Sequence, residues 1–230
     1  MSIEARSGGS WIVRWSPLGG LIFVVGAVIL AFTPALEGSG DTPAEVVAFA
    51  EDNESWTGIL AIFSLASLLL LGWFVAGLAV RLREVSASAE AAVALVGGVT
   101  FVVLSFIAFT IFTAPLFGIN EDNSSAEKLS IASTLLNIDD IGWVALGGSG
   151  VGAGLMAIAA SLGALRTRSA PAWACWIGVL LGVLSLATIT FVGLFGWLLW
   201  IGLASLGMLF YRRPREMRTG APGAGPSPAG

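Results

Sequence analysis

The sequence predicts an all-α protein, a polytopic bundle of about six transmembrane helices with two short helices on its outer side. Three observations lead to this prediction. Hydrophobic residues make up 56% of the chain and charged residues only 11%, whereas soluble domains are about a quarter charged. The apolar residues stand in long uninterrupted blocks of the length that crosses a membrane as a helix. Lys and Arg gather in alternate loops, as in multi-pass membrane proteins.

Each of the six apolar blocks predicts one membrane-spanning helix, because a backbone in lipid must satisfy its own hydrogen bonds. In chain order the predicted spans are 17–36, 56–80, 91–117, 141–165, 172–190 and 194–211. The first is interpreted as a retained anchor rather than a signal peptide, because its apolar stretch is long and its cleavage site poor. The last two are separated by three residues, which favours a tight hairpin; one long bent or re-entrant segment is the alternative.

The basic residues predict the orientation of the spans. Ten of the eleven precede the first span, lie between spans two and three or four and five, or follow span six. Only Lys128 lies on the other side, together with eleven of the fifteen acidic residues. By the positive-inside rule, residues 1–16 form a cytoplasmic N-terminal segment, 17–211 the membrane domain and 212–230 a cytoplasmic tail. The expected location is the plasma membrane, with both termini in the cytoplasm.

The two long outer loops each carry a helix-start signal. Thr42-Pro43-Ala44-Glu45 and Ser124-Ser125-Ala126-Glu127 are capping boxes, the first with proline at the first helical position. Each predicts a short helix at the membrane surface or over the bundle. The unit of span, capped helix and span then occurs twice in the same orientation, as parallel repeats do in some transporters. The alternative is that any outer helix benefits from a cap.

Small residues recur every fourth position in the fourth and fifth predicted spans. This helix-packing ridge consists of Ala145, Ser149, Ala153, Ala157 and Ser161 in the fourth span, and Gly178 and Gly182 continue the pattern on a ridge of the fifth span. Small residues at this spacing let helices approach closely in lipid, where no hydrophobic driving force exists between them. The ridge indicates packing inside one bundle, with homodimerisation as the alternative.

Residues able to perform chemistry are scarce. The chain has no histidine, and no acidic or basic residue falls inside a predicted span, which argues against proton pumps and ion-coupled transporters. No catalytic, cofactor-binding or metal-ligating residue is predicted, and no cofactor is expected. The nearest candidates are Asp139 and Asp140 at the outer mouth of the fourth span, followed by Trp143. Adjacent carboxylates could bind a cation, but we interpret them as caps of the span, where they oppose the helix dipole.

The inner side offers one charged candidate and one thiol. The arginines that follow the last span are candidate lipid-headgroup contacts: Arg212, Arg213, Arg215 and Arg218. They also serve as a simple stop-transfer flank. The tail after them is rich in Gly, Ala, Pro and Ser and should be disordered. Cys175 lies near the inner interface, where palmitoylation is conceivable; an unmodified packing residue is the preferred interpretation.

The segment 171–178, Pro-Ala-Trp-Ala-Cys-Trp-Ile-Gly, resembles a motif of small six-helix bacterial integral membrane proteins of unknown function that are common in actinobacteria. An acidic segment at 43–53 and the arginine-flanked end of the last helix are similar to theirs as well. The resemblance covers most of residues 17–213 and implies a six-helix membrane fold. It brings no catalytic residue.

Three functions follow, in order of preference. The first is a non-catalytic scaffold, accessory subunit or partner-binding bundle, favoured by the ridge and the lack of buried charge. The second is a permease or carrier for an apolar or lipid-like solute, favoured by the repeat and the glycine-rich fourth span. A membrane enzyme comes third and would depend on Asp139 and Asp140. Expected partners are membrane lipid and either another membrane subunit or a second copy of the chain, with no nucleic acid.

Overall fold

The structure, a computed structural model, describes residues 8–31, 40–54, 57–188 and 192–210. Within these ranges the chain is all-helical and contains no strand, so the all-α part of the predicted fold class is confirmed. The described helices are α1 (Gly8–Ala31), α2 (Pro43–Asp52), α3 (Thr57–Glu84), α4 (Ser88–Gly118), α5 (Ser125–Thr167), α6 (Ala172–Ser185) and α7 (Val192–Phe210).

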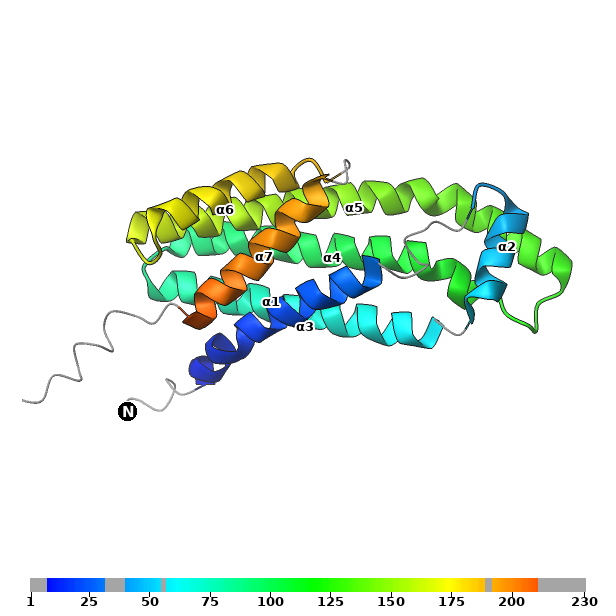
Figure 1. Cartoon of the computed structure of the whole chain (residues 1–230), viewed down its shortest axis with the longest axis horizontal. Coiled ribbons are helices and arrows are strands. Elements are labelled where there is room, and N and C mark those ends of the chain that lie inside the picture. The colour runs from blue at the N-terminus through cyan, green and yellow to red at the C-terminus, as the bar shows by residue number, and fades with distance from the viewer. Residues whose placement is uncertain (1–7, 32–39, 55–56, 189–191, 211–230) are drawn as a thin grey trace, which may run out of the picture.

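Six of these helices form an elongated bundle, and α2 crosses one end of it (Figure 1). The long helices α4 and α5 pack side by side; α3 covers α4, α6 covers α5, and α1 and α7 close the remaining side. We call the end that carries α2 the outer end and the opposite end the inner end. α1 begins and α7 ends at the inner end (Figure 1).

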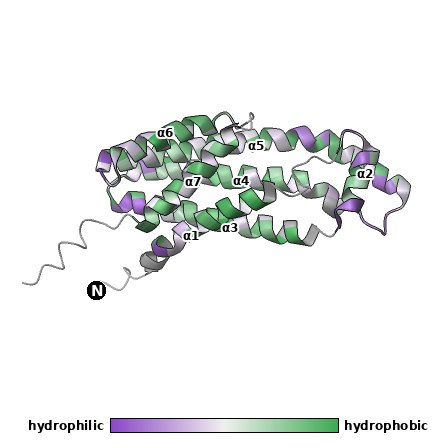
Figure 2. Cartoon of the chain, viewed as in Figure 1, coloured by the Kyte–Doolittle hydropathy of each residue, from purple (hydrophilic) through white to green (hydrophobic). Residues whose placement is uncertain are grey.

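Several helices are suited to a membrane. Four described segments are long and apolar enough to cross one: Ile62–Glu84, Ser88–Pro115, Ser125–Thr167 and Gly193–Phe210. Two shorter apolar segments, Val13–Ile29 and Ala172–Ser185, lie in α1 and α6. Large apolar side chains are exposed along all six helices, and Figure 2 shows hydrophilic residues concentrated toward the two ends. Soluble proteins rarely expose apolar surface on this scale, so the chain is a membrane protein.

An aromatic cluster occupies the middle of the bundle. Phe23 of α1, Phe101 of α4 and Trp197 of α7 are all at least 94% buried. Their ring centroids lie 5.1–6.1 Å apart, in the tilted and edge-to-face arrangements that aromatic quadrupoles favour. Because each ring comes from a different helix, the cluster fixes the position of α1 and α7 against α4.

The first predicted outer helix is confirmed and the second is not a separate element. Thr42 caps α2 with a complete capping box. Ser124 caps α5 in the same way, but α5 then runs without interruption for 43 residues into the fourth predicted span. The prediction that Asp139 and Asp140 cap that span is therefore wrong, since both lie in the interior of α5. No glycine or proline stands between Ser125 and Ile141 to end the helix.

The α6–α7 segment is a hairpin of two antiparallel helices rather than one bent segment. Gly178 of α6 packs against Trp200 of α7, and Gly196 of α7 against Ser185 of α6, so residue numbers rise along one helix as they fall along the other. α6 has 14 residues, or about 21 Å of helix. Its end meets α5 at Gly150, against Ser185 and Thr188. Residues 189–191 lie outside the described ranges.

Arg81 connects three helices at the inner end. Pro17 in α1 has no N–H, so the carbonyl of Val13, four residues earlier, lacks its usual helical donor. Arg81 of α3 donates to this carbonyl at 3.2 Å and to the carbonyl of Met208, in the last turn of α7, at 2.7 Å. The Ser16 hydroxyl also donates to the Val13 carbonyl, at 3.4 Å. The guanidinium thus donates to one carbonyl whose helical donor a proline removes and to one near a helix end.

The outer end is held by a small cluster of its own. Val46 and Ala50 of α2 are buried against Ile119, which directly follows α4, and Ala132 of α5. An ion pair with an N–O distance of 2.6 Å joins Lys128 of α5 to Glu51 of α2. These contacts attach α2 to the extended first part of α5. We call α2, the first part of α5 and the 119–124 turn the outer tier.

Candidate functional site: an apolar groove between α3 and α4

The acidic pair predicted from the sequence lies in the interior of α5. The Asp139 carboxylate accepts a hydrogen bond from the indole Nε1 of Trp143, one turn later on α5, at 3.1 Å. Asp140 is exposed. Within the described residues, no group of three or more Cys, Asp or Glu side chains could hold a metal ion. The three candidates lie on one stretch of α5 in which Asp140 and Trp143 are exposed and Asp139 is partly buried. The described contact among them is a helical i, i+4 pair.

The small-residue ridge lies inside the bundle. Its members on α5 are all buried, as are Gly178 and Gly182 of α6. Gly152 is so close to α4 that a Cβ there would lie 2.6 Å from the backbone nitrogen of Phe101, and Gly154 so close to α6 that a Cβ would lie 2.7 Å from the carbonyl of Gly182. Glycines thus bring α5 into backbone contact with a neighbour on either side.

The remaining sequence candidates are a thiol and four arginines. Cys175 is 97% buried in α6, which fits a packing residue rather than a modified one. Arg212, Arg213, Arg215 and Arg218 lie outside the described residues.

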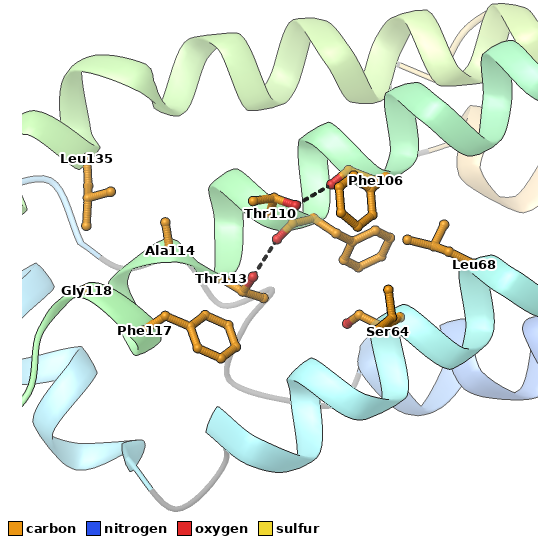
Figure 3. A pocket seen from close by; sticks show the side chains of 11 residues that line it. Ser64, Leu68, Phe106, Thr110, Thr113, Ala114, Phe117, Gly118 and Leu135 are labelled. Carbon is orange, nitrogen blue, oxygen red and sulfur yellow. Dashed lines mark hydrogen bonds between the residues drawn. The ribbon is translucent and has the colours of Figure 1, made fainter.

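An open groove lies between α3 and α4 toward the outer end, and the sequence analysis did not identify it. The two helices are joined at the inner end by the short turn Val85–Ala87, and the groove lies between their far ends (Figure 3). Its volume is about 570 Å³, within the range of small-molecule sites. We call it the outer groove; its lining residues are Ser64, Leu65, Leu68, Phe106, Phe109, Thr110, Thr113, Ala114, Phe117, Gly118 and Leu135.

The walls of the outer groove are largely apolar. Three phenylalanines of α4 line one side, and Figure 3 shows Leu68 and Ser64 on α3 across from them. The hydroxyls of Thr110 and Thr113 donate to the carbonyls of Phe106 and Phe109, both at 2.7 Å. Because these donors are used within α4, the threonines present mainly methyl groups and acceptor lone pairs to the groove.

Ser64 is the exception among the polar lining residues. Its Oγ is shielded from solvent and has no hydrogen-bond partner within the described parts of the chain. Buried polar atoms are paired in most proteins, and one without a partner calls for an explanation. A ligand atom in the groove could supply that partner.

The position of the groove along the helices sets the depth at which a ligand would bind. Leu68 and Ser64 precede Arg81 by 13 and 17 residues, or about 20 and 26 Å of helix. Thr113 and Gly118 follow Ser88 by 25 and 30 residues, or about 38 and 45 Å. The hydrocarbon core of a bilayer is about 30 Å thick. With the hydrocarbon core placed outward from Arg81 and Ser88, the groove would begin within the core and end near its outer limit.

Comparison with family models, with curated proteins and with solved structures finds no match to the chain.

Proposed function

We propose that this chain is a non-catalytic, partner-binding protein of the plasma membrane that binds an apolar ligand or partner segment in the outer groove. The observation that supports this function is the groove itself: an apolar opening of about 570 Å³ beside an otherwise glycine-packed bundle. The preferred use of such a surface is binding, because the described lining offers no acid, base or thiol to act on a bound molecule.

The proposal includes six spans with both termini in the cytoplasm. The two shorter apolar helices lie beside the four long ones in the same bundle, and the arginines of the short loops share one side of the predicted topology. In a protein with Cys175→Ala as background, Asn123→Cys should react with an impermeant thiol reagent from outside intact cells. Ser169→Cys should react only after permeabilisation. Labelling of Ser169→Cys in intact cells would reverse the orientation.

Binding in the outer groove can be tested by photo-crosslinking. Phe109, which lines the groove, is replaced by a photoreactive phenylalanine analogue, and the membranes are irradiated. We expect an adduct that disappears when Ala114→Phe fills the groove. Ala66→Phe, on the exposed side of α3 outside the lining set, is the matched control and should leave the adduct unchanged. An adduct that persists at equal yield in Ala114→Phe would refute binding in the groove.

A carrier for a lipid-like solute is the second candidate, favoured by the extent of the groove from hydrocarbon depth to the outer tier. The two candidates differ in transbilayer flux. In proteoliposomes that contain a headgroup-labelled fluorescent phospholipid, a carrier would make inner-leaflet label accessible to a membrane-impermeant quencher within minutes. A binding protein would leave half of the label protected. We expect the protected fraction to match that of protein-free liposomes.

A further inference from the structure

We infer that the outer groove binds one glycerophospholipid of the outer leaflet, with an acyl chain against the phenylalanines and an ammonium-bearing headgroup at the outer rim. The inference rests on the proposed function, because it names the chemical class of the ligand for the same groove. Three features carry it: the depth of the groove, the unpartnered hydroxyl of Ser64, and the charge of the outer tier.

The depth of the groove fits an amphiphile better than a wholly apolar solute. The inner part, at Leu68 and Phe106, lies within about 27 Å of the inner end, inside the hydrocarbon thickness. The outer part, at Phe117 and Gly118, lies past the end of the apolar segment Ser88–Pro115. A molecule that fills the groove must therefore be apolar at its inner end and tolerate the headgroup zone at its outer end. A lipid of the outer leaflet has this polarity and already stands in this orientation.

The mouth of the groove is continuous with the surface that lipid covers. Leu65 and Phe106, one on each wall, are 52% and 48% exposed. The neighbouring Ile62 and Leu69 of α3 and Val103 and Ile107 of α4 are exposed as well. A chain from the adjacent bilayer can therefore enter sideways without crossing a polar barrier, and no water-filled path is needed.

Ser64 stands at the depth where a lipid has its ester groups. Its hydroxyl lies about 26 Å from the inner end by helix rise, just inside the outer limit of the hydrocarbon. This hydroxyl is the groove donor without a partner in the described structure, since Thr110 and Thr113 donate to their own helix. An ester carbonyl is an acceptor that can be reached from hydrocarbon. A bound lipid would thus satisfy the one groove hydroxyl that the protein leaves unsatisfied.

The charge of the outer tier selects among headgroups. Glu121 and Asp122 follow the groove residue Gly118 by three and four residues. Lys128 is the one basic residue between the second and fourth predicted spans on this side, and its ammonium is paired with Glu51 at 2.6 Å. The described outer tier therefore carries a net negative charge, from Glu45, Glu51, Asp52, Glu121, Asp122 and Glu127 against Lys128. This charge disfavours an anionic headgroup nearby relative to one that bears an ammonium group.

The experiment uses the full chain in nanodiscs of equimolar phosphatidylethanolamine and phosphatidylglycerol with identical acyl chains. The protein is released into mild detergent, and retained lipid is counted by native mass spectrometry. We expect one phospholipid per chain, with phosphatidylethanolamine exceeding phosphatidylglycerol about five-fold, the ratio that corresponds to about 1 kcal/mol for one charge near a membrane surface. Ser64→Ala should lower occupancy, Ala114→Phe should abolish it, and Ala66→Phe should leave it unchanged.

The outcomes separate the inference from the proposed function. If Ala114→Phe does not fold, Thr110→Phe fills the groove from an exposed position and replaces it. Retained lipid that is equal in the groove-filling variant and the Ala66→Phe control, or that matches the bulk ratio of headgroups, would overturn the lipid inference. The Phe109 crosslink then tests the proposed function. An adduct whose mass differs from that of a phospholipid, and which disappears when the groove is filled, leaves the proposed function standing. If no adduct forms, both the lipid inference and the proposed function are refuted.

Discussion

Replacing Arg81 with methionine should destabilise the protein by about 3 kcal/mol. Methionine retains an unbranched apolar stem of similar length, so the change removes the guanidinium and little packing volume. The guanidinium donates to the carbonyls of Val13 and Met208. Hydrogen bonds from charged donors contribute about 1.5–3 kcal/mol each, and the lower value, taken twice, gives the estimate. Arg83→Met, two residues along α3 at an exposed position, is the matched control and should change stability by less than about 0.5 kcal/mol.

Proline 17 makes this prediction specific. In Pro17→Ala the new N–H can donate to the Val13 carbonyl, which then no longer depends on Arg81. Arg81→Met should therefore cost about 1.5 kcal/mol less in the Pro17→Ala background than in the parent, because one of the two described hydrogen bonds of Arg81 has been replaced. The difference between the two costs is the coupling energy of a double-mutant cycle.

The four proteins of this cycle can be compared by unfolding in mixed micelles of increasing SDS fraction, followed by the fluorescence of the nine tryptophans. Equal costs of Arg81→Met in both backgrounds would show that Arg81 does not replace the donor missing at Pro17. A cost for Arg83→Met as large as that for Arg81→Met would mean that general charge at the inner surface, rather than the two carbonyl contacts, is measured.

Three further predictions concern helix contacts and caps. Gly152→Ala should cost about 1–3 kcal/mol of stability by overpacking against α4. Gly202→Ala, whose Cβ would meet nothing within 4 Å, should be neutral or stabilising by up to about 1 kcal/mol. If the thermal midpoints of the two variants in detergent shift alike, Gly152 is not in close contact with α4. Ser124→Ala should cost about 1 kcal/mol of stability, because it removes the N-cap of α5. Asp140→Ala, in the interior of α5, should change stability by no more than about 0.5 kcal/mol. A larger fall in the thermal midpoint for Asp140→Ala than for Ser124→Ala would place the helix start at the aspartates. The backbone N–H groups of Asp41 and Thr42 lower the pKa of Glu45. The contribution of the Glu45 carboxylate to folding stability is therefore present above the ordinary pKa of a glutamate and is lost as pH falls through the lowered value. The thermal midpoint should fall on acidification below about pH 4.5, and that of Glu45→Gln, whose capping box is uncharged, should fall less.

The sequence was sufficient for the features that depend on local chemistry. Both capping boxes form as predicted, because a serine or threonine and a glutamate three residues later need only each other and the helix start. The small-residue spacing on α5 also reflects a local rule, since one helical face must repeat every three or four residues. The apolar blocks identify the membrane class for the same reason.

Features that depend on the packing of distant segments could not be predicted. The polar run 137–140 looked like a boundary, but a helix ends where its hydrogen bonds are broken, and the side chains of Thr134 and Asn137 bond back to their own helix instead. The outer groove combines Ser64, Phe117 and Leu135 from three helices. Its existence depends on how α3 and α4 are packed, and no residue spacing within either helix encodes that.

The undivided α5 helix forms one long continuous element that reaches both ends of the bundle. Its 43 residues extend for about 64 Å, about twice the hydrocarbon thickness, and Gly152 lies close to the backbone of α4 at Gly97 and Phe101. The outer arm from there to Ser125 is about 40 Å long and the inner arm to Thr167 about 22 Å. A tilt of roughly 5° about this contact would move the outer tip by about 3.5 Å and the inner tip by about 2 Å in the opposite direction. One uninterrupted helix thus carries both the Lys128–Glu51 ion pair at the outer end and the Arg166–Glu90 ion pair at the inner end.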